Sequence, residues 1–175
     1  MRRATRRLNR LKKIMPVGTF IDIGCNIGFT VEAARRLGYD ATGLELDVET
    51  VKQAQVRFQQ AEFMAGTAMD MAITGRRFDI VYCTDVLEHV IDVQYFAKTL
   101  AQLTRPGGIL FLSTPDAGHW RVPRDFLAWN EVKPPQHLCW FTRQSLTRLL
   151  EDAGFSIRSF AFNLKPGLKV TATRQ

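Results

Sequence analysis

Two glycines and an asparagine follow a short apolar run near the start of the chain, in the segment Phe20-Ile-Asp-Ile-Gly-Cys-Asn-Ile-Gly28. Gly24 and Gly28 let the backbone approach a ligand closely, and the helix expected next offers free N–H groups to an anion. Because G-x-x-x-G replaces the G-x-G-x-x-G of dinucleotide-binding folds, a diphosphate cradle is not indicated. Asn26 tolerates a positive φ better than most side chains, so the tight turn remains feasible.

An acidic side chain, Glu45, ends the next predicted strand. A carboxylate at this point can accept hydrogen bonds from both hydroxyls of a ribose. The glycine turn and this carboxylate together predict a nucleoside site beyond the carboxyl ends of the first two strands.

Residues 115–141 show no helix or strand pattern, and loops of this length usually have a function. The segment contains all three tryptophans, Trp120, Trp129 and Trp140. Aromatic walls with a few polar groups are typical of small-molecule pockets, so we predict a substrate loop or lid with these tryptophans as substrate-binding residues. The alternative is a loop whose aromatic side chains only seal the domain.

The candidate general bases for a hydroxyl acceptor are two histidines of this loop, His137 ahead of His119. Either could instead be a hydrogen-bonded packing residue. Asp85, Glu88 and His89 are spaced i, i+3, i+4, which places them on one face if the segment is helical. Such a group could bind a divalent ion, although we favour a structural cap and predict no metal.

Short β-rich runs alternate with helical patterns and would position these residues. Strands are predicted over residues 19–23, 41–46, 62–65, 78–83 and 109–112, and helices over 28–37, 48–59 and 92–103. This order predicts a parallel sheet with helices on both faces. A helix capped by Thr142 then precedes two strand-like runs, 155–163 and 168–173, whose short connection permits only antiparallel pairing.

Together these residues resemble the class I S-adenosylmethionine-dependent methyltransferases, in the small-molecule branch that includes the ubiquinone-biosynthesis O-methyltransferases. The resemblance covers about residues 18–155 and rests on five motifs in order: Asp22-x-Gly24-x-x-x-Gly28, Gly43-Leu-Glu45, Phe78-Asp-Ile-Val-Tyr-Cys-Thr-Asp-Val-Leu-Glu-His89, Pro106-Gly-Gly108, and Gln136-His137 with the later Gly154-Phe155. It implies an α/β, Rossmann-like, doubly wound fold. Its seven-stranded, mostly parallel sheet has the order 3-2-1-4-5-7-6, with strand 7 antiparallel.

The resemblance also implies S-adenosylmethionine as the cofactor and S-adenosylhomocysteine as the product. The methionine part would lie on the turn after the first strand, the ribose would bind Glu45, and the adenine would lie beside Thr67, where relatives usually carry an aspartate. The side chains just past the fourth strand would face the methyl-bearing sulfur. The implied cofactor residues are Asp22, Gly24, Cys25, Asn26, Gly28, Glu45, Leu46, Thr67, Ala68, Cys83 and Thr84.

The positive charge is concentrated at one end of the chain. Residues 1–13 carry seven cations and no anion, whereas acidic and basic residues balance in the remainder. Leu8, Leu11 and Met15 recur there at helical spacing, which predicts a basic amphipathic helix over 1–16 ahead of a methyltransferase domain over 17–175. The helix could contact RNA or an anionic membrane; we favour a solvated helix lying across the domain.

Composition excludes several other classes. With 175 residues, 46% hydrophobic and 23% charged, the chain is neither collagen-like nor a coiled coil nor wholly disordered. Three cysteines without a CxxC pair favour reduced thiols, and the start lacks the apolar core of a secretory signal. We therefore expect a cytoplasmic protein that binds no DNA, with its oligomeric state left open.

The function indicated by the resemblance is methyl transfer to an oxygen, or a nitrogen, of a small-molecule acceptor. Two alternatives remain open: an RNA methyltransferase that grips phosphate with its basic start, and a cofactor-binding module without turnover. Relatives usually carry more helical sequence before the first strand, where it helps to roof the site.

Overall fold

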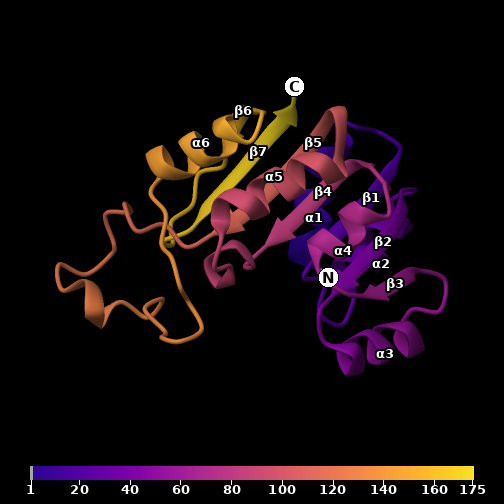
Figure 1. Ribbon diagram of the computed structural model, residues 1–175, viewed down its shortest axis with the longest axis horizontal. Coiled ribbons are helices and arrows are strands. Elements are labelled where there is room, and N and C mark those ends of the chain that lie inside the picture. Colours follow the sequence, from indigo (N-terminus) through magenta and orange to yellow (C-terminus); the bar gives the residue numbers. More distant parts are fainter. Residues whose placement is uncertain (1) are drawn as a thin grey trace.

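The computed structural model describes residues 2–175, without the side chains of Arg2 and Arg3. Seven strands form one sheet of order β3-β2-β1-β4-β5-β7-β6 (Figure 1). β7 pairs antiparallel with both β5 and β6, and the other pairs are parallel. The predicted fold class and strand order are confirmed. The strands are β1 Thr19–Ile23, β2 Asp40–Glu45, β3 Glu62–Ala65, β4 Phe78–Thr84, β5 Thr104–Thr114, β6 Phe155–Phe160 and β7 Leu168–Arg174.

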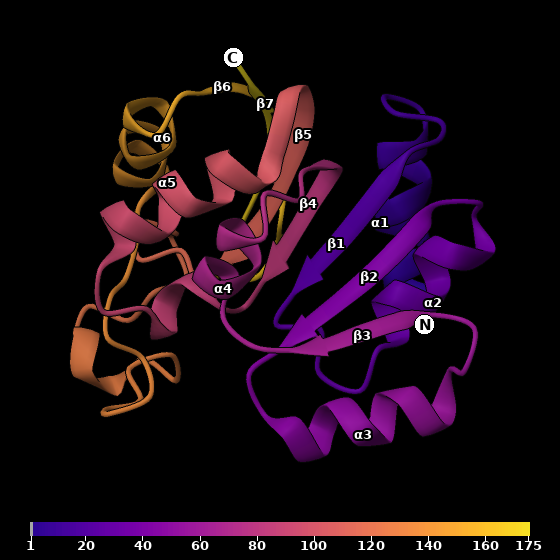
Figure 2. The same cartoon turned by 45° about the vertical axis from the view of Figure 1, so that its right-hand side comes forward.

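Helices cover both faces of the sheet, as the alternation of strands and helices requires. Figure 2 shows α4 and α5 in front of the strands and α1 and α2 behind them. Two buried apolar clusters fill these layers, one beneath α4, α5 and α6 and the other beneath α1, α2 and α3. The helices are α1 Arg2–Lys12, α2 Phe29–Arg36, α3 Val48–Arg57, α4 Ala68–Ile73, α5 Val93–Leu103 and α6 Arg143–Asp152, with short 3-10 turns η1 Leu87–His89 and η2 Phe126–Ala128.

The basic N-terminal helix is anchored to the domain. Leu8 and Leu11 are almost fully buried in the core, at 0% and 2% exposure, each contributing about 1.5–3 kcal/mol through burial. Lys12 Nζ donates to the carbonyl of Leu37 at 2.7 Å, which ties α1 to the end of α2. Of the segment 1–13 predicted to contact RNA or a membrane, Met1 and the side chains of Arg2 and Arg3 lie outside the described residues.

Two local features differ from the sequence-based expectations, whereas the predicted loop over residues 115–141 is present. α4 was not predicted, although Thr67 and Asp70 form a reciprocal capping box at its start. β5 begins directly after α5 and is longer than the predicted strand over 109–112. Residues 115–141 contain only the short turn η2 and leave the body of the molecule as an extended orange loop (Figure 1). No helix in the described part of the chain is long and apolar enough to cross a bilayer.

Candidate active site

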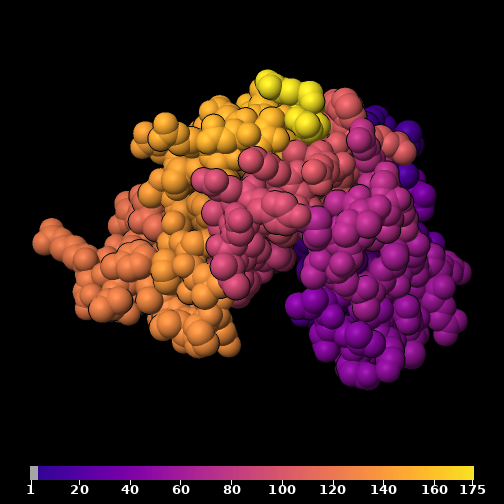
Figure 3. Space-filling view, in the orientation of Figure 1, coloured from indigo at the N-terminus to yellow at the C-terminus, as the bar shows by residue number. Residues whose placement is uncertain are grey.

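A cavity of about 690 Å³ opens beyond the carboxyl ends of β1, β2 and β4. Ligands of open α/β sheets bind at this edge, where the strand order reverses. Figure 3 shows the surface hollowed at its lower edge, between the purple part of the chain and the pink and orange parts. The walls consist of Ile23, Gly24, Asn26, Leu44, Glu45, Leu46, Gly66, Thr67, Ala68, Met69, Asp85, Val86, His89, Val90, Ile91, Asp92, Tyr95, Phe96 and Thr99.

The turn between β1 and α2 requires its glycines. Gly24 and Gly28 have φ of 73° and 81°, and Asn26 has φ of 49°, so the predicted positive φ at Asn26 is confirmed. A Cβ on Gly28 would lie 2.5 Å from the ring of Phe63, and one on Gly24 would lie 2.5 Å from Val86 Cγ2. The turn therefore keeps its backbone close to the neighbouring side chains at the edge of the cavity.

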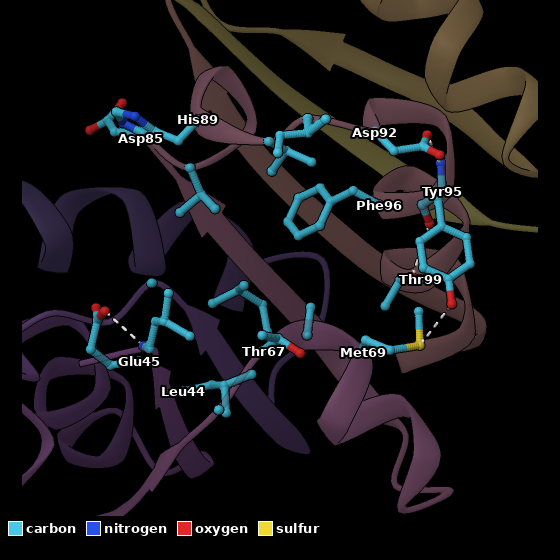
Figure 4. Close-up of a pocket in the computed structure, with 18 of the residues that line it drawn as sticks. Leu44, Glu45, Thr67, Met69, Asp85, His89, Asp92, Tyr95, Phe96 and Thr99 are labelled. Carbon is cyan, nitrogen blue, oxygen red and sulfur yellow. Dashed lines mark hydrogen bonds between the residues drawn. The ribbon is translucent and has the colours of Figure 1, made fainter. Parts of the chain in front are cut away.

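The Glu45 carboxylate is held in place by the backbone. One oxygen accepts from the N–H of Asn26 at 2.9 Å, and the other accepts from the N–H of Leu46 at 2.8 Å. A carboxylate has about four lone-pair positions, so both oxygens can still accept from a ligand. Figure 4 shows Glu45 at the cavity wall with its hydrogen bond, and Asp85 and His89 together above it.

Two predicted adenine-side residues, Thr67 and Ala68, also line the cavity. The Thr67 hydroxyl caps α4 by accepting from the N–H of Asp70 at 3.1 Å and donating to its carboxylate at 2.7 Å. Because this hydroxyl is held within the capping box, Thr67 offers a neutral oxygen with one remaining lone pair where an aspartate would offer a carboxylate.

Four predicted cofactor residues lie behind the cavity wall. Asp22, Cys25, Gly28 and Cys83 are buried and absent from the lining. Burial raises the pKa of the Asp22 carboxyl, and burial likewise raises the pKa of the Cys83 thiol. Cys83 points into the apolar core because a strand covered on both faces turns alternate side chains into the two helical layers.

Thr84, at the end of β4, is only partly buried but is also absent from the lining; the next residue, Asp85, occupies the wall instead. Asp85 has φ of 58°, a rare conformation for a residue other than glycine.

The first half of α5 supplies further walls through Tyr95 and Phe96. Asp92 caps the start of this helix by accepting from the N–H of Tyr95 at 2.9 Å.

A second cavity of about 360 Å³ adjoins the first, and Asp85 and His89 line both. It lies where β5 ends and β7 begins, and α1 closes one side. Its walls are mainly polar and consist of Arg7, Asp85, Glu88, His89, Ser113, Thr114, Pro115, Glu131, Lys133, His137, Asn163, Pro166, Gly167, Leu168 and Lys169.

Backbone carbonyls fix the tautomers of the two histidines in this second cavity. Nδ1 of His137 lies 2.7 Å from the carbonyl of Glu131, and Nδ1 of His89 lies 2.8 Å from the carbonyl of Gln136. A carbonyl only accepts, so each Nδ1 carries the hydrogen and each neutral ring keeps a lone pair on Nε2. Nε2 is therefore the atom through which either ring can accept a proton.

His119, the second candidate base, lies elsewhere. Its Nδ1 accepts from the N–H of Arg121 at 3.1 Å, and its Nε2 donates to the carbonyl of Asn163 at 3.2 Å. Both ring nitrogens are thus bonded to backbone groups, one in the loop and one between β6 and β7, and His119 lines neither cavity in the described part of the chain.

The tryptophans do not form the predicted aromatic wall. Trp120 is 74% exposed, Trp129 is buried against Phe126, and Trp140 donates from Nε1 to the carbonyl of Glu131 at 2.8 Å. Trp129 and Trp140 both pack against Phe126 and brace the loop, in keeping with the alternative interpretation, whereas Trp120 stacks on His119 at the surface. Polar side chains form the wall of the smaller cavity instead, because η1 and residues 131–137 lie beside the end of β5.

Glu88, His89 and His137 place one potential ligand atom each within 4.8 Å of one another. The sequence suggested Asp85, Glu88 and His89 as such a group. In the structure Asp85 instead accepts from Ser113 Oγ at 3.2 Å, and His137 is the third member. Glu88 is 2% exposed, accepts from Thr114 at 3.0 Å, and has its pKa raised by burial. A divalent ion would be held here by one oxygen and two nitrogen donors.

A protein-family model described as a methyltransferase domain matches residues 1–159. The chain belongs to this family. The resemblance to S-adenosylmethionine-dependent methyltransferases predicted from the motifs is thereby confirmed.

Curated relatives of this methyltransferase carry related names. The ubiquinone biosynthesis O-methyltransferase of Rhizobium leguminosarum bv. trifolii is 36% identical over 98 residues, which cover 54% of the chain and 39% of the relative. The mitochondrial enzyme of that name from Arabidopsis thaliana is 29% identical over 157 residues, which cover 78% of the chain and 48% of the relative. The chain therefore matches less than half the length of both relatives.

Solved structures share the fold of this methyltransferase. An S-adenosylmethionine-dependent methyltransferase from Mesorhizobium loti is 20% identical, with a TM-score of 0.75 over 95% of this chain and 96% of that one. A magnesium protoporphyrin IX methyltransferase from Synechocystis, solved with S-adenosylhomocysteine, is 19% identical, with a TM-score of 0.76 over 99% and 83% of the two chains. At these identities the likeness shows the common fold.

Proposed function

We propose that the protein binds S-adenosylmethionine in the larger cavity and transfers its methyl group to an oxygen of a small molecule in the smaller cavity. The observation that carries this proposal is the Glu45 carboxylate, held by two backbone N–H groups at the end of β2 and open to the larger cavity. Relatives named O-methyltransferases support oxygen over nitrogen as the acceptor atom.

Residues from β2, from the turn after β1 and from α5 would bind S-adenosylmethionine. Glu45 accepts from the ribose diol, and Gly24 and Asn26 of the turn line the part of the cavity where the amino-acid end would lie. Tyr95 and Phe96 supply apolar surface to the nucleoside. We assign Asp22 and Cys25 a supporting role behind this turn, since both are buried.

S-adenosylmethionine supplies a methyl group on a sulfonium leaving group. The protein must therefore mainly hold the acceptor oxygen in line with that methyl, and orientation of this kind is worth roughly 7–11 kcal/mol of barrier. The two cavities meet at Asp85 and His89, which places the reaction at their junction. We assign His137 as the general base that receives the acceptor proton on Nε2, and we give His119 no role.

The proposal is tested with the intact protein. Calorimetric titration with S-adenosylhomocysteine should show one site, and S-adenosylmethionine with a methyl-³H label should transfer tritium to members of a panel of catechols and phenols. Absence of S-adenosylhomocysteine binding to folded protein would refute the proposal. Binding without transfer to any panel member would instead favour a module without turnover.

Three further features of the protein are predictions from the sequence. Contact of residues 1–13 with RNA or an anionic membrane, a cytoplasmic location and the oligomeric state rest on sequence patterns alone.

A further inference from the structure

Arg7 differs from Arg6 and Arg10 in its position on α1. It lies four residues before the buried Leu11 and therefore on the face that packs against the sheet. Arg6, Arg10 and Lys13 lie on the exposed face. The packing of Leu8 and Leu11 thus turns Arg7 inward, and its side chain lines the smaller cavity.

The Arg7 guanidinium is partly buried without a carboxylate partner. Nη1 donates to the hydroxyl of Tyr82 at 3.3 Å, and no ion pair joins Arg7 to an acid within the described residues. A guanidinium stays charged in proteins and has five N–H donors. Removing such a group from water is costly unless an anion compensates, so its surroundings favour an anionic ligand.

The acids that face the same cavity are already engaged by other donors. Asp85 accepts from Ser113 at 3.2 Å, Glu88 accepts from Thr114 at 3.0 Å, and Glu131 pairs with Lys133 at 3.5 Å. Lys169 contributes a further cation to the wall. Arg7 therefore offers the cavity charge-assisted donors that no carboxylate of the wall has taken.

We propose that Arg7 binds an oxyanion on the methyl acceptor, so that the substrate is a small hydroxylated carboxylic acid or phosphate ester. The planar fork of a guanidinium matches both kinds of oxyanion. A cavity of about 360 Å³ has room for a single small ring and its substituents. The acceptor hydroxyl would then face His137 while the oxyanion lies against Arg7. This inference rests on the proposed function, since it names the substrate class of that site.

The test uses matched probes and the full chain. Benzoate, phenyl phosphate and the neutral benzamide are titrated by calorimetry, with and without saturating S-adenosylhomocysteine. We expect at least one of the two anions to bind about tenfold or more tightly than benzamide, as a charge-assisted hydrogen bond requires. The tighter anion distinguishes a carboxylate from a phosphate substrate.

Variants assign the preference to Arg7. Arg7→Gln should abolish the preference for the anion, Arg7→Lys should keep part of it, and Arg10→Gln, on the exposed face of the same helix, should keep all of it. Unchanged thermal unfolding and S-adenosylhomocysteine affinity show that the Arg7 variants are folded. If Arg7→Gln does not fold, a weaker preference for the anion in Arg7→Lys than in wild type assigns the preference to Arg7.

The inference is overturned if neither anion binds, if benzamide binds as tightly as the anions, or if Arg10→Gln loses the preference as fully as Arg7→Gln. Any of these results with normal S-adenosylhomocysteine binding leaves the proposed function intact. Failure of the wild-type protein to bind S-adenosylhomocysteine would instead count against the proposed function.

Discussion

The rings of His89 and His137 meet edge to face, with centroids 4.9 Å apart and an interplanar angle of 77°. One follows β4 and the other lies in the loop after β5, and a backbone carbonyl holds Nδ1 of each. The contact brings two Nε2 lone pairs to the cavity that adjoins the proposed cofactor site. The chemistry that we assign to His137 depends on this arrangement.

Replacing His137 should reduce turnover, whereas replacing His119 should not. His137→Gln removes the proposed base, so kcat should fall about 10²-fold or more, while the affinity for S-adenosylhomocysteine stays unchanged. His119→Gln should leave kcat within about twofold, because both nitrogens of His119 bind backbone groups, those of Arg121 and Asn163. Steady-state kinetics with one acceptor measures both variants. Equal losses in the two variants would contradict the assignment.

Glu45 should control cofactor affinity. Glu45→Ala removes the acceptor for the ribose diol and should weaken S-adenosylhomocysteine binding about tenfold or more, given about 1.5–3 kcal/mol for a hydrogen bond to a charged group. Calorimetry measures the change. Glu49→Ala is the matched control, since Glu49 is exposed on α3, lies outside both cavities and pairs with Lys52 at 2.7 Å. An unchanged dissociation constant for Glu45→Ala would contradict its role.

A methyl group at Gly28 should destabilise the fold through two effects. Its φ of 81° strains any other residue, and the added Cβ would overlap the Phe63 ring at 2.5 Å. Gly38→Ala isolates the first effect, because Gly38 has φ of 92° with nothing within 4 Å of the new Cβ. Urea unfolding should show a loss of about 1 kcal/mol for Gly38→Ala and about 2–4 kcal/mol for Gly28→Ala. Equal losses would mean that Phe63 moves aside freely.

The carboxyl of Asp22 should make stability depend on pH. Burial raises its pKa, so the folded protein keeps this proton at pH values where the unfolded chain, with a pKa of about 3.9, has lost it. The folded state then binds more protons, and the free energy of unfolding falls as pH rises above about 4 toward the raised pKa of the folded state. Asp22→Asn removes this loss.

The measurement for Asp22 is thermal unfolding of wild type and Asp22→Asn at pH 5 and pH 8. We expect the stability of the variant, relative to wild type, to improve from the lower pH to the higher one. A relative stability that is the same at both pH values would show that Asp22 titrates alike in the folded and unfolded chains.

The amino-acid sequence alone predicted the fold and part of the wall of the larger cavity. Gly24, Asn26 and Gly28 follow one strand, and Glu45 ends the strand that pairs with it, so local patterns and one parallel pairing suffice to bring them together. The capping box of Thr67 and Asp70 was readable in the same way, although α4 was not predicted from it.

Only the tertiary structure decided the acceptor side. Whether His137 or His119 keeps a free nitrogen depends on the carbonyls of Glu131 and Asn163, and a loop without a periodic pattern does not specify such contacts. Arg7 likewise looks like its neighbours in a run of cations until Leu11 packs on the sheet and turns it inward. Side-chain periodicity reports which face of an element is buried, but the partners that meet there come from distant parts of the chain and are set by packing.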